Sequence, residues 1–112
     1  MHLTAADVAL ELHRAAGLGS SEAALTAAVA ARQACSDAVW LFVMHHARYC
    51  QFHNGTVCHM AAAANLWQLF RFFCTTGASP RTLNSMRMLP SETAADAGHV
   101  CTAVHIRCVY EA

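Results

Sequence analysis

The chain has 112 residues, of which 56% are hydrophobic and only 12% are charged, and seven arginines balance seven acidic residues. This composition excludes an intrinsically disordered chain, which needs few apolar residues and a high net charge. A formal net charge of zero also argues against a basic surface for nucleic acid. The length suits one domain, so we expect a single helical domain over residues 1–112.

The supply of polar side chains is small for a domain of this size. A small domain has a large surface relative to its volume and needs many polar residues to cover it. We therefore expect apolar surface to remain once the core is filled, and such surface usually marks contact with a protein or a membrane. An alternative is a monomer that needs no partner. The 24 alanines raise the apolar count, yet alanine is tolerated on every face of a helix, including the exposed one.

The first residues lack the basic segment and following apolar segment of a secretory signal. We therefore expect an intracellular protein, in the cytoplasm or in an organelle such as the mitochondrion. The longest charge-free run, residues 49–70, is interrupted by polar side chains too often for a membrane span of about 20 residues. The sequence thus contains no clear transmembrane helix, although a position beside a membrane stays open.

The chain begins with a short predicted helix from Thr4 to about Ala16. Thr4 is a suitable N-cap, and Asp7 follows it at the spacing of a capping box. Gly17 is placed to end the helix. One face of this segment is apolar, and its members are Val8, Leu12 and Ala15.

Two long helices are predicted next, joined as a hairpin. No glycine or proline occurs from Ser20 to Asn54, so one helix of about 30 residues, about 45–50 Å long, fits this stretch. Asn54 and Gly55 are typical of a turn. Thr56 then caps a third helix over residues 57–76.

The remaining segments are shorter. Pro80 predicts the start of a helix that Pro90 closes, and residues 91–97 can add a turn or two. Residues 100–110 alternate in the period-two pattern of a β-strand, while a helical reading of the same residues stays open. Because a lone strand needs a partner, residues 100–112 are predicted to be a docking tail on another chain.

Cysteine and histidine are dense around the predicted turn. His46, Cys50 and His53 share one face if they lie on a helix, and Cys58 or His59 returns toward them after the turn. Four nitrogen and sulfur ligands of this kind suit tetrahedral zinc. Against this, the chain has no Cys-x-x-Cys pair, and cysteine and neutral histidine are also ordinary core residues.

The same spacing recurs at Cys101, His105 and Cys108, where it matters only if the tail is helical. In an intracellular setting the six cysteines are expected to be reduced thiols. The sequence contains no glycine-rich phosphate loop, no Gly-x-Ser-x-Gly motif and no His-Glu-x-x-His motif. These observations predict a protein that is not an enzyme and holds no cofactor other than the zinc of the alternative hypothesis. An enzyme that uses a cysteine–histidine pair stays open as a third hypothesis.

The fold class predicted from these elements is mostly α: a long helical hairpin, short flanking helices and an extended or helical C-terminal tail. The favoured function is a non-catalytic accessory or structural subunit that binds other protein subunits of a larger assembly. The alternative is a small helical zinc-binding domain that uses His46, Cys50, His53 and Cys58. The residues predicted to contact partner proteins are Trp67, Phe70, Phe72, Phe73, Val104, Ile106 and Tyr110.

Overall fold

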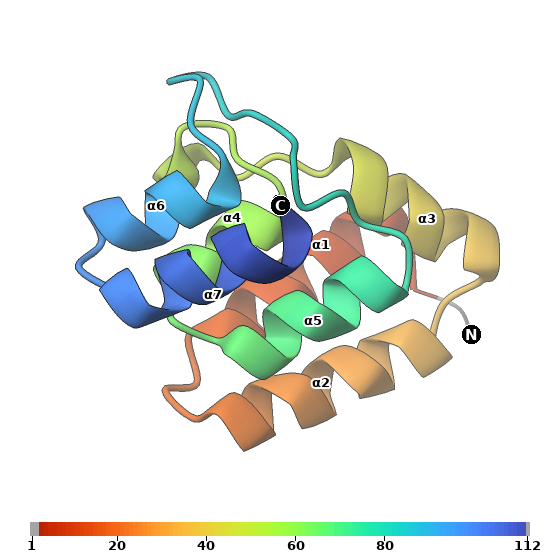
Figure 1. Ribbon diagram of the computed structural model, residues 1–112. Helices are drawn as coiled ribbons and strands as arrows, with labels where there is room; N and C mark the ends of the chain where they lie inside the picture. The colour runs from red at the N-terminus through yellow and green to blue at the C-terminus, as the bar shows by residue number, and fades with distance from the viewer. Residues whose placement is uncertain (1–2, 112) are drawn as a thin grey trace.

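A computed structural model describes residues 3–111, and its mostly α-helical fold confirms the predicted class. Figure 1 shows α4 near the middle of the molecule, with α2 at the bottom of the view, α3 on the right, and α6 and α7 on the left. The described residues form α1 (Ala5–Ala16), α2 (Ser21–Gln33), α3 (Asp37–His46), the 3-10 helix η1 (Cys50–Phe52), α4 (Val57–Ala63), α5 (Trp67–Thr75), α6 (Pro90–Asp96) and α7 (Val100–Tyr110).

Helix α1 forms where its local signals predict it. The Thr4 hydroxyl accepts a hydrogen bond from the Asp7 N–H at 3.2 Å, and the Asp7 carboxylate accepts one from the Thr4 N–H at 3.2 Å. The helix ends at Gly17, as predicted. Its predicted apolar face is buried, and consists of Val8, Leu12 and Ala15.

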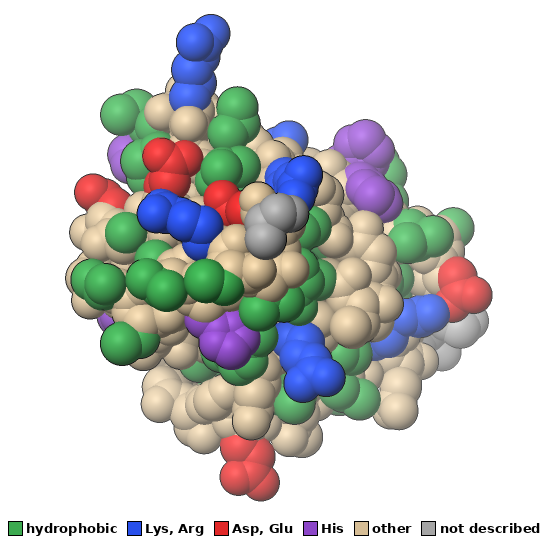
Figure 2. All heavy atoms as spheres, viewed as in Figure 1, with side chains coloured by type: hydrophobic (Ala, Val, Ile, Leu, Met, Phe, Trp, Pro, Cys, Tyr) green, Lys and Arg blue, Asp and Glu red, His purple; other side chains and the backbone are tan. Residues whose placement is uncertain are grey.

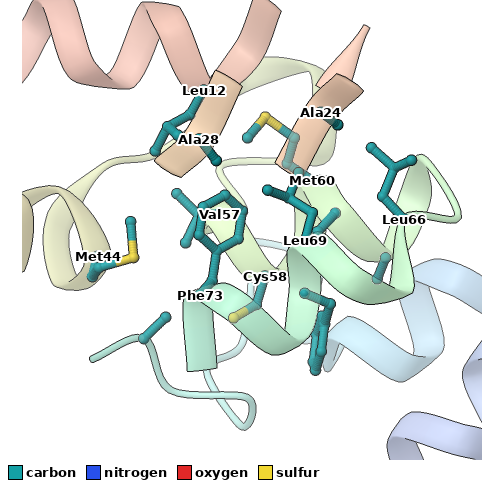
Figure 3. Close-up of a cluster of buried hydrophobic side chains, with 14 of the residues drawn as sticks. Leu12, Ala24, Ala28, Met44, Val57, Cys58, Met60, Leu66, Leu69 and Phe73 are labelled. Atoms are coloured by element: carbon teal, nitrogen blue, oxygen red, sulfur yellow. The ribbon is translucent and has the colours of Figure 1, made fainter. Parts of the chain in front are cut away.

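Helix α2 contributes small side chains to the core. It packs against α1 and α5, and its buried residues are Ala24, Ala28 and Ala31. An alanine methyl group buries little area, but it lets a neighbouring helix approach closely. Larger side chains from other helices fill the space beside these alanines, as Figure 3 shows for Leu12, Leu69 and Phe73.

Residues 20–54 do not form one long helix, which corrects the predicted hairpin. Helix α2 ends at Gln33, and α3 begins after Ser36, whose hydroxyl accepts a hydrogen bond from the Val39 N–H at 3.2 Å. An unbroken helix would be about 45–50 Å long, whereas the longest dimension of the molecule is 40 Å. The bend returns α3 to the core, where it buries Trp40, Val43 and Met44.

The predicted helix over residues 57–76 is also two helices, with a sharp bend between them. Asn65 has a left-handed backbone with φ of 60°, which asparagine tolerates better than most residues. The Leu66 N–H then donates to the Ala61 carbonyl at 2.9 Å and closes the end of α4. The bend allows α1, α5 and α6 to surround α4, in which every residue from Val57 to Ala62 is buried.

The predicted helix over residues 80–89 does not form, and an irregular loop takes its place. A buried asparagine holds this loop together. The Asn84 side-chain oxygen accepts hydrogen bonds from the Met86 and Met88 N–H groups at 2.9 and 3.0 Å, and its NH₂ donates to the Phe52 carbonyl at 3.2 Å. These bonds satisfy backbone groups that a helix would have paired.

Pro90 has the opposite role to the predicted one. It occupies the first turn of α6 instead of closing a preceding helix. Proline suits this position because the N–H that it lacks would have no partner within the helix. The Leu89 N–H donates to the Glu92 carboxylate at 2.9 Å and completes the start of α6.

Residues 100–110 form helix α7, so the predicted strand is wrong and the helical alternative is confirmed. No strand is present among residues 3–111 to pair with an extended tail, whereas a helix satisfies its own backbone. Helix α7 packs on α6, with Ala103 and Ile106 buried. The Tyr110 ring lies 5.4 Å from the Phe70 ring and fixes the end of α7 against α5.

Candidate functional site

The strongest candidate for a functional surface is the solvent-facing side of α7. Val100, Val104 and Val109 are 63%, 53% and 57% exposed, although valine is normally a core residue. Together with neighbouring side chains they line one shallow hollow, which we call the outer face of α7: Val100, Cys101, Val104, His105, Cys108 and Val109. Figure 2 shows hydrophobic side chains in a row over the part of the molecule where Figure 1 places this helix.

Several contacts fix α7 in position. The His99 side chain is hydrogen bonded through Nε2 to the Ala63 carbonyl at 3.1 Å, and the Thr102 hydroxyl donates to the Asn65 side chain. At the other end, the Arg81 guanidinium donates to the Tyr110 carbonyl at 3.0 Å. Because contacts hold both ends of α7, the outer face has a fixed orientation relative to the rest of the protein.

The outer face is suited to binding a macromolecule and lacks the shape of a small-molecule pocket. All six lining residues belong to α7, so a small ligand would be covered on one side only. Ligand pockets normally bury most of the surface of a small molecule. An exposed, largely apolar half of one helix instead suits the packing of side-chain ridges into grooves by which helices associate.

The residues predicted to bind partners divide between the core and the surface. Phe70, Phe73 and Ile106 are fully buried in the protein's own core, so they form no exposed surface. Trp67, Phe72 and Tyr110 are partly buried against that core, and Val104 is exposed. Within residues 3–111, no helix combines the length and apolar character that crossing a bilayer requires.

Most of the outer face was not predicted from the sequence, because residues 100–110 also alternate with the period of two that is typical of a strand. A helical reading of the tail places residues four apart on one side. Val100, Val104 and Cys108 have this spacing, as do Cys101, His105 and Val109. This signal was available in the sequence, but only the packing of α7 on α6 decides which side faces solvent.

The four predicted zinc ligands do not form a site. Helix α3 ends at His46, Cys50 lies in η1, and His53 follows in a left-handed turn with φ of 54°. The shared helical face that the prediction requires is therefore absent, and Cys58 is buried in α4. Across residues 3–111, no group of three or more histidine, cysteine or acidic side chains is arranged to hold a metal ion.

Cys101, His105 and Cys108 share one side of helix α7, but they too are not arranged to hold a metal ion. The ring of His105 lies 3.8 Å from that of Trp67, so its position is set by an aromatic contact.

Among the described residues, His59 and Ser91 are the polar side chains with no exposed surface, and His59 is the one that can take up a proton. It is fully buried; its Nδ1 accepts a hydrogen bond from the Thr56 N–H at 3.0 Å, and its Nε2 lies 2.8 Å from the Met88 carbonyl. The proton is therefore on Nε2, which donates to Met88. Burial lowers the pKa of His59, and the nearby Arg48 adds to this effect against the opposing hydrogen bond to Met88. The imidazole joins α4 to the loop before α6 and has no access to a substrate.

Comparison of the chain with protein-family models, curated proteins and solved structures finds no match.

Proposed function

We propose that this protein is a non-catalytic helical subunit that binds another protein of a larger assembly through the outer face of α7. The observation that carries the proposal is the exposure of three valines, Val100, Val104 and Val109, across the solvent-facing half of α7. Contiguous exposed apolar surface is the usual mark of a protein contact.

The form of the surface favours a helical segment of the partner protein. An 11-residue helix is about 16 Å long, and its side chains form ridges that fit the grooves of a second helix at a separation of about 8–10 Å. None of the outer-face residues carries a permanent charge. We therefore expect the partner segment to present an apolar side and to bury Val104, which lies within the exposed half of α7.

A charge placed on this face tests the proposal with little effect on the fold. In Val104→Glu, the new carboxylate has to be desolvated in the complex, while glutamate has a higher helix propensity than valine. Leu10→Glu is the matched control, because Leu10 is 50% exposed on α1, a helix that packs mainly on α2, α3 and α4. The measurement is the native mass in an extract of cells that produce the protein, with helix content checked by circular dichroism.

We expect the parent chain and Leu10→Glu to elute in a large assembly, and Val104→Glu to elute as the free 12.1 kDa chain. The proposal is wrong if the parent chain elutes alone, or if folded Val104→Glu remains in the assembly. A purified parent chain that elutes at twice its own mass, with Val104→Glu at the single mass, would identify the partner as a second copy.

A further inference from the structure

Two cysteines meet between α4 and α5, apart from the outer face of α7. The sulfur atoms of Cys58 and Cys74 are 3.9 Å apart, and both side chains are free thiols. Cys58 is fully buried, whereas Cys74, near the end of α5, is partly exposed. Figure 3 shows the Cys58 side chain extending from α4 toward the ribbon of α5.

The two thiols differ in how readily they lose a proton. A hydrogen bond between them lowers the pKa of Cys74, although its partial burial opposes this effect. The same hydrogen bond, together with burial, raises the pKa of Cys58 well above its ordinary value. Cys74, the less buried of the two, is therefore the thiol that forms a thiolate more readily. Thiolates are the reactive form of cysteine.

We propose that Cys58 and Cys74 are a redox-active dithiol that reduces a small hydroperoxide, such as hydrogen peroxide, and closes to an intramolecular disulfide. Cys74 is the attacking thiol because solvent reaches it, and Cys58 is the resolving thiol because it is buried beside Cys74. The inference is independent of the function proposed for α7.

The reaction balances in two steps. The Cys74 thiolate attacks one peroxide oxygen and breaks the O–O bond, so that Cys74 becomes a sulfenic acid and the other oxygen leaves as water with the proton released by Cys74. The Cys58 sulfur then attacks Cys74 Sγ and breaks its S–O bond, and the hydroxyl group leaves as water with the proton of Cys58. One peroxide is reduced to two water molecules as two thiols are oxidised to one disulfide.

The second step requires only a small movement. A disulfide has an S–S distance of about 2.05 Å, so the two sulfur atoms must approach by about 1.9 Å from their separation of 3.9 Å. Rotation of the Cys74 side chain at the partly exposed end of α5 can supply part of this movement.

The test is peptide mapping of the full chain after treatment with one equivalent of hydrogen peroxide. Cleavage after arginine gives peptide 49–71, which contains Cys50 and Cys58, and peptide 72–81, which contains Cys74. We would therefore use Cys50→Ser as the parent protein, since Cys50 is exposed and its replacement leaves one thiol in each peptide. Thiols that remain free are alkylated in denaturant before digestion.

We expect peptides 49–71 and 72–81 to be joined, with a mass lower by two hydrogen atoms than the sum of the reduced pair. Cys74→Ser should reduce oxidation of Cys58 at least about tenfold, because the buried thiol then has no exposed partner. Cys58→Ser should leave Cys74 as a sulfenic acid that dimedone captures.

The proposal is overturned if Cys58 and Cys74 stay alkylatable while the exposed Cys101 and Cys108 are oxidised. It is also overturned if Cys74 proceeds to sulfinic acid without joining Cys58. Both outcomes are read from the Cys50→Ser protein itself, so they do not depend on whether the variants at Cys58 and Cys74 fold.

Discussion

Gly55 and His59 are fitted to each other at the start of α4. A Cβ atom added to Gly55 would lie 2.6 Å from the Cβ of His59 and 2.9 Å from the Phe52 carbonyl oxygen. Moving the flexible end of a side chain cannot relieve contacts this short. The atoms involved are the Phe52 carbonyl oxygen and the Cβ of the buried His59 side chain, which is bonded directly to the backbone. The absence of a side chain at residue 55 therefore allows His59 to occupy its buried position.

Gly55→Ala should destabilise the protein by about 1–3 kcal/mol, the range for overpacking a filled site. The free energy of unfolding, measured by urea denaturation, checks this value. Gly17→Ala is the control: its Cβ would meet only ordinary contacts at 3.5 Å or more, so we expect a change within about 0.5 kcal/mol. Equal stabilities of the two variants would contradict the close fit at Gly55.

Stability should fall as the pH drops below 6.5, the ordinary pKa of histidine, because the pKa of His59 is lowered in the folded state. In this range the unfolded chain binds a proton at residue 59 that the folded protein excludes, and the slope can reach about 1.4 kcal/mol per pH unit. The slope disappears below the folded-state pKa. The check is urea denaturation of the variants between about pH 7 and about pH 5. The free energy of unfolding of His59→Gln should lack the His59 part of this slope, whereas His46→Gln, a change at an exposed position, should keep it. A parent slope retained in His59→Gln would refute the assignment.

Ile106→Ala should cost about 2–5 kcal/mol of stability, because Ile106 is fully buried in α7. Val104→Ala should change stability by less than about 0.5 kcal/mol, since Val104 is exposed and alanine favours the helix. A strand would place residues 104 and 106 on one side and give both substitutions a similar cost. Urea denaturation of the two variants thus distinguishes the helix from the strand.

Asn65→Ala should destabilise the bend between α4 and α5 by about 1–2 kcal/mol, because alanine is strained at a φ of 60°. Asn65→Gly keeps the backbone freedom and loses only the hydrogen bond from Thr102, so it should be the more stable of the two variants. Thermal unfolding followed by circular dichroism measures the difference. If the alanine variant is as stable as the glycine variant, the left-handed backbone at residue 65 is not what ends α4.

Local chemistry was enough to predict some elements from the sequence. The capping box of Thr4 and Asp7 and the stop at Gly17 involve atoms a few residues apart, and α1 has the predicted start and end. The apolar excess likewise predicted exposed hydrophobic surface, and three valines of α7 are exposed. Such signals need no knowledge of what packs against the segment.

The breaks within the long helices depended on distant parts of the chain. Residues 34–36 contain neither glycine nor proline, yet the helix ends there because Trp40 and Met44 have to reach a core shared with other helices. For the same reason the structure does not bring the four predicted zinc ligands together, since the prediction required a helix that continued past His46.

The sequence by itself determined that the chain is mostly helical, where α1 lies, and that apolar side chains exceed what a small core can hold. Only the tertiary structure decided that the tail is a helix, that Ile106 faces inward while Val104 faces outward, and that Cys58 meets Cys74. The physical reason is that caps and turns act through bonds between near neighbours, whereas the buried side of a helix and the pairing of distant thiols depend on which segments pack together.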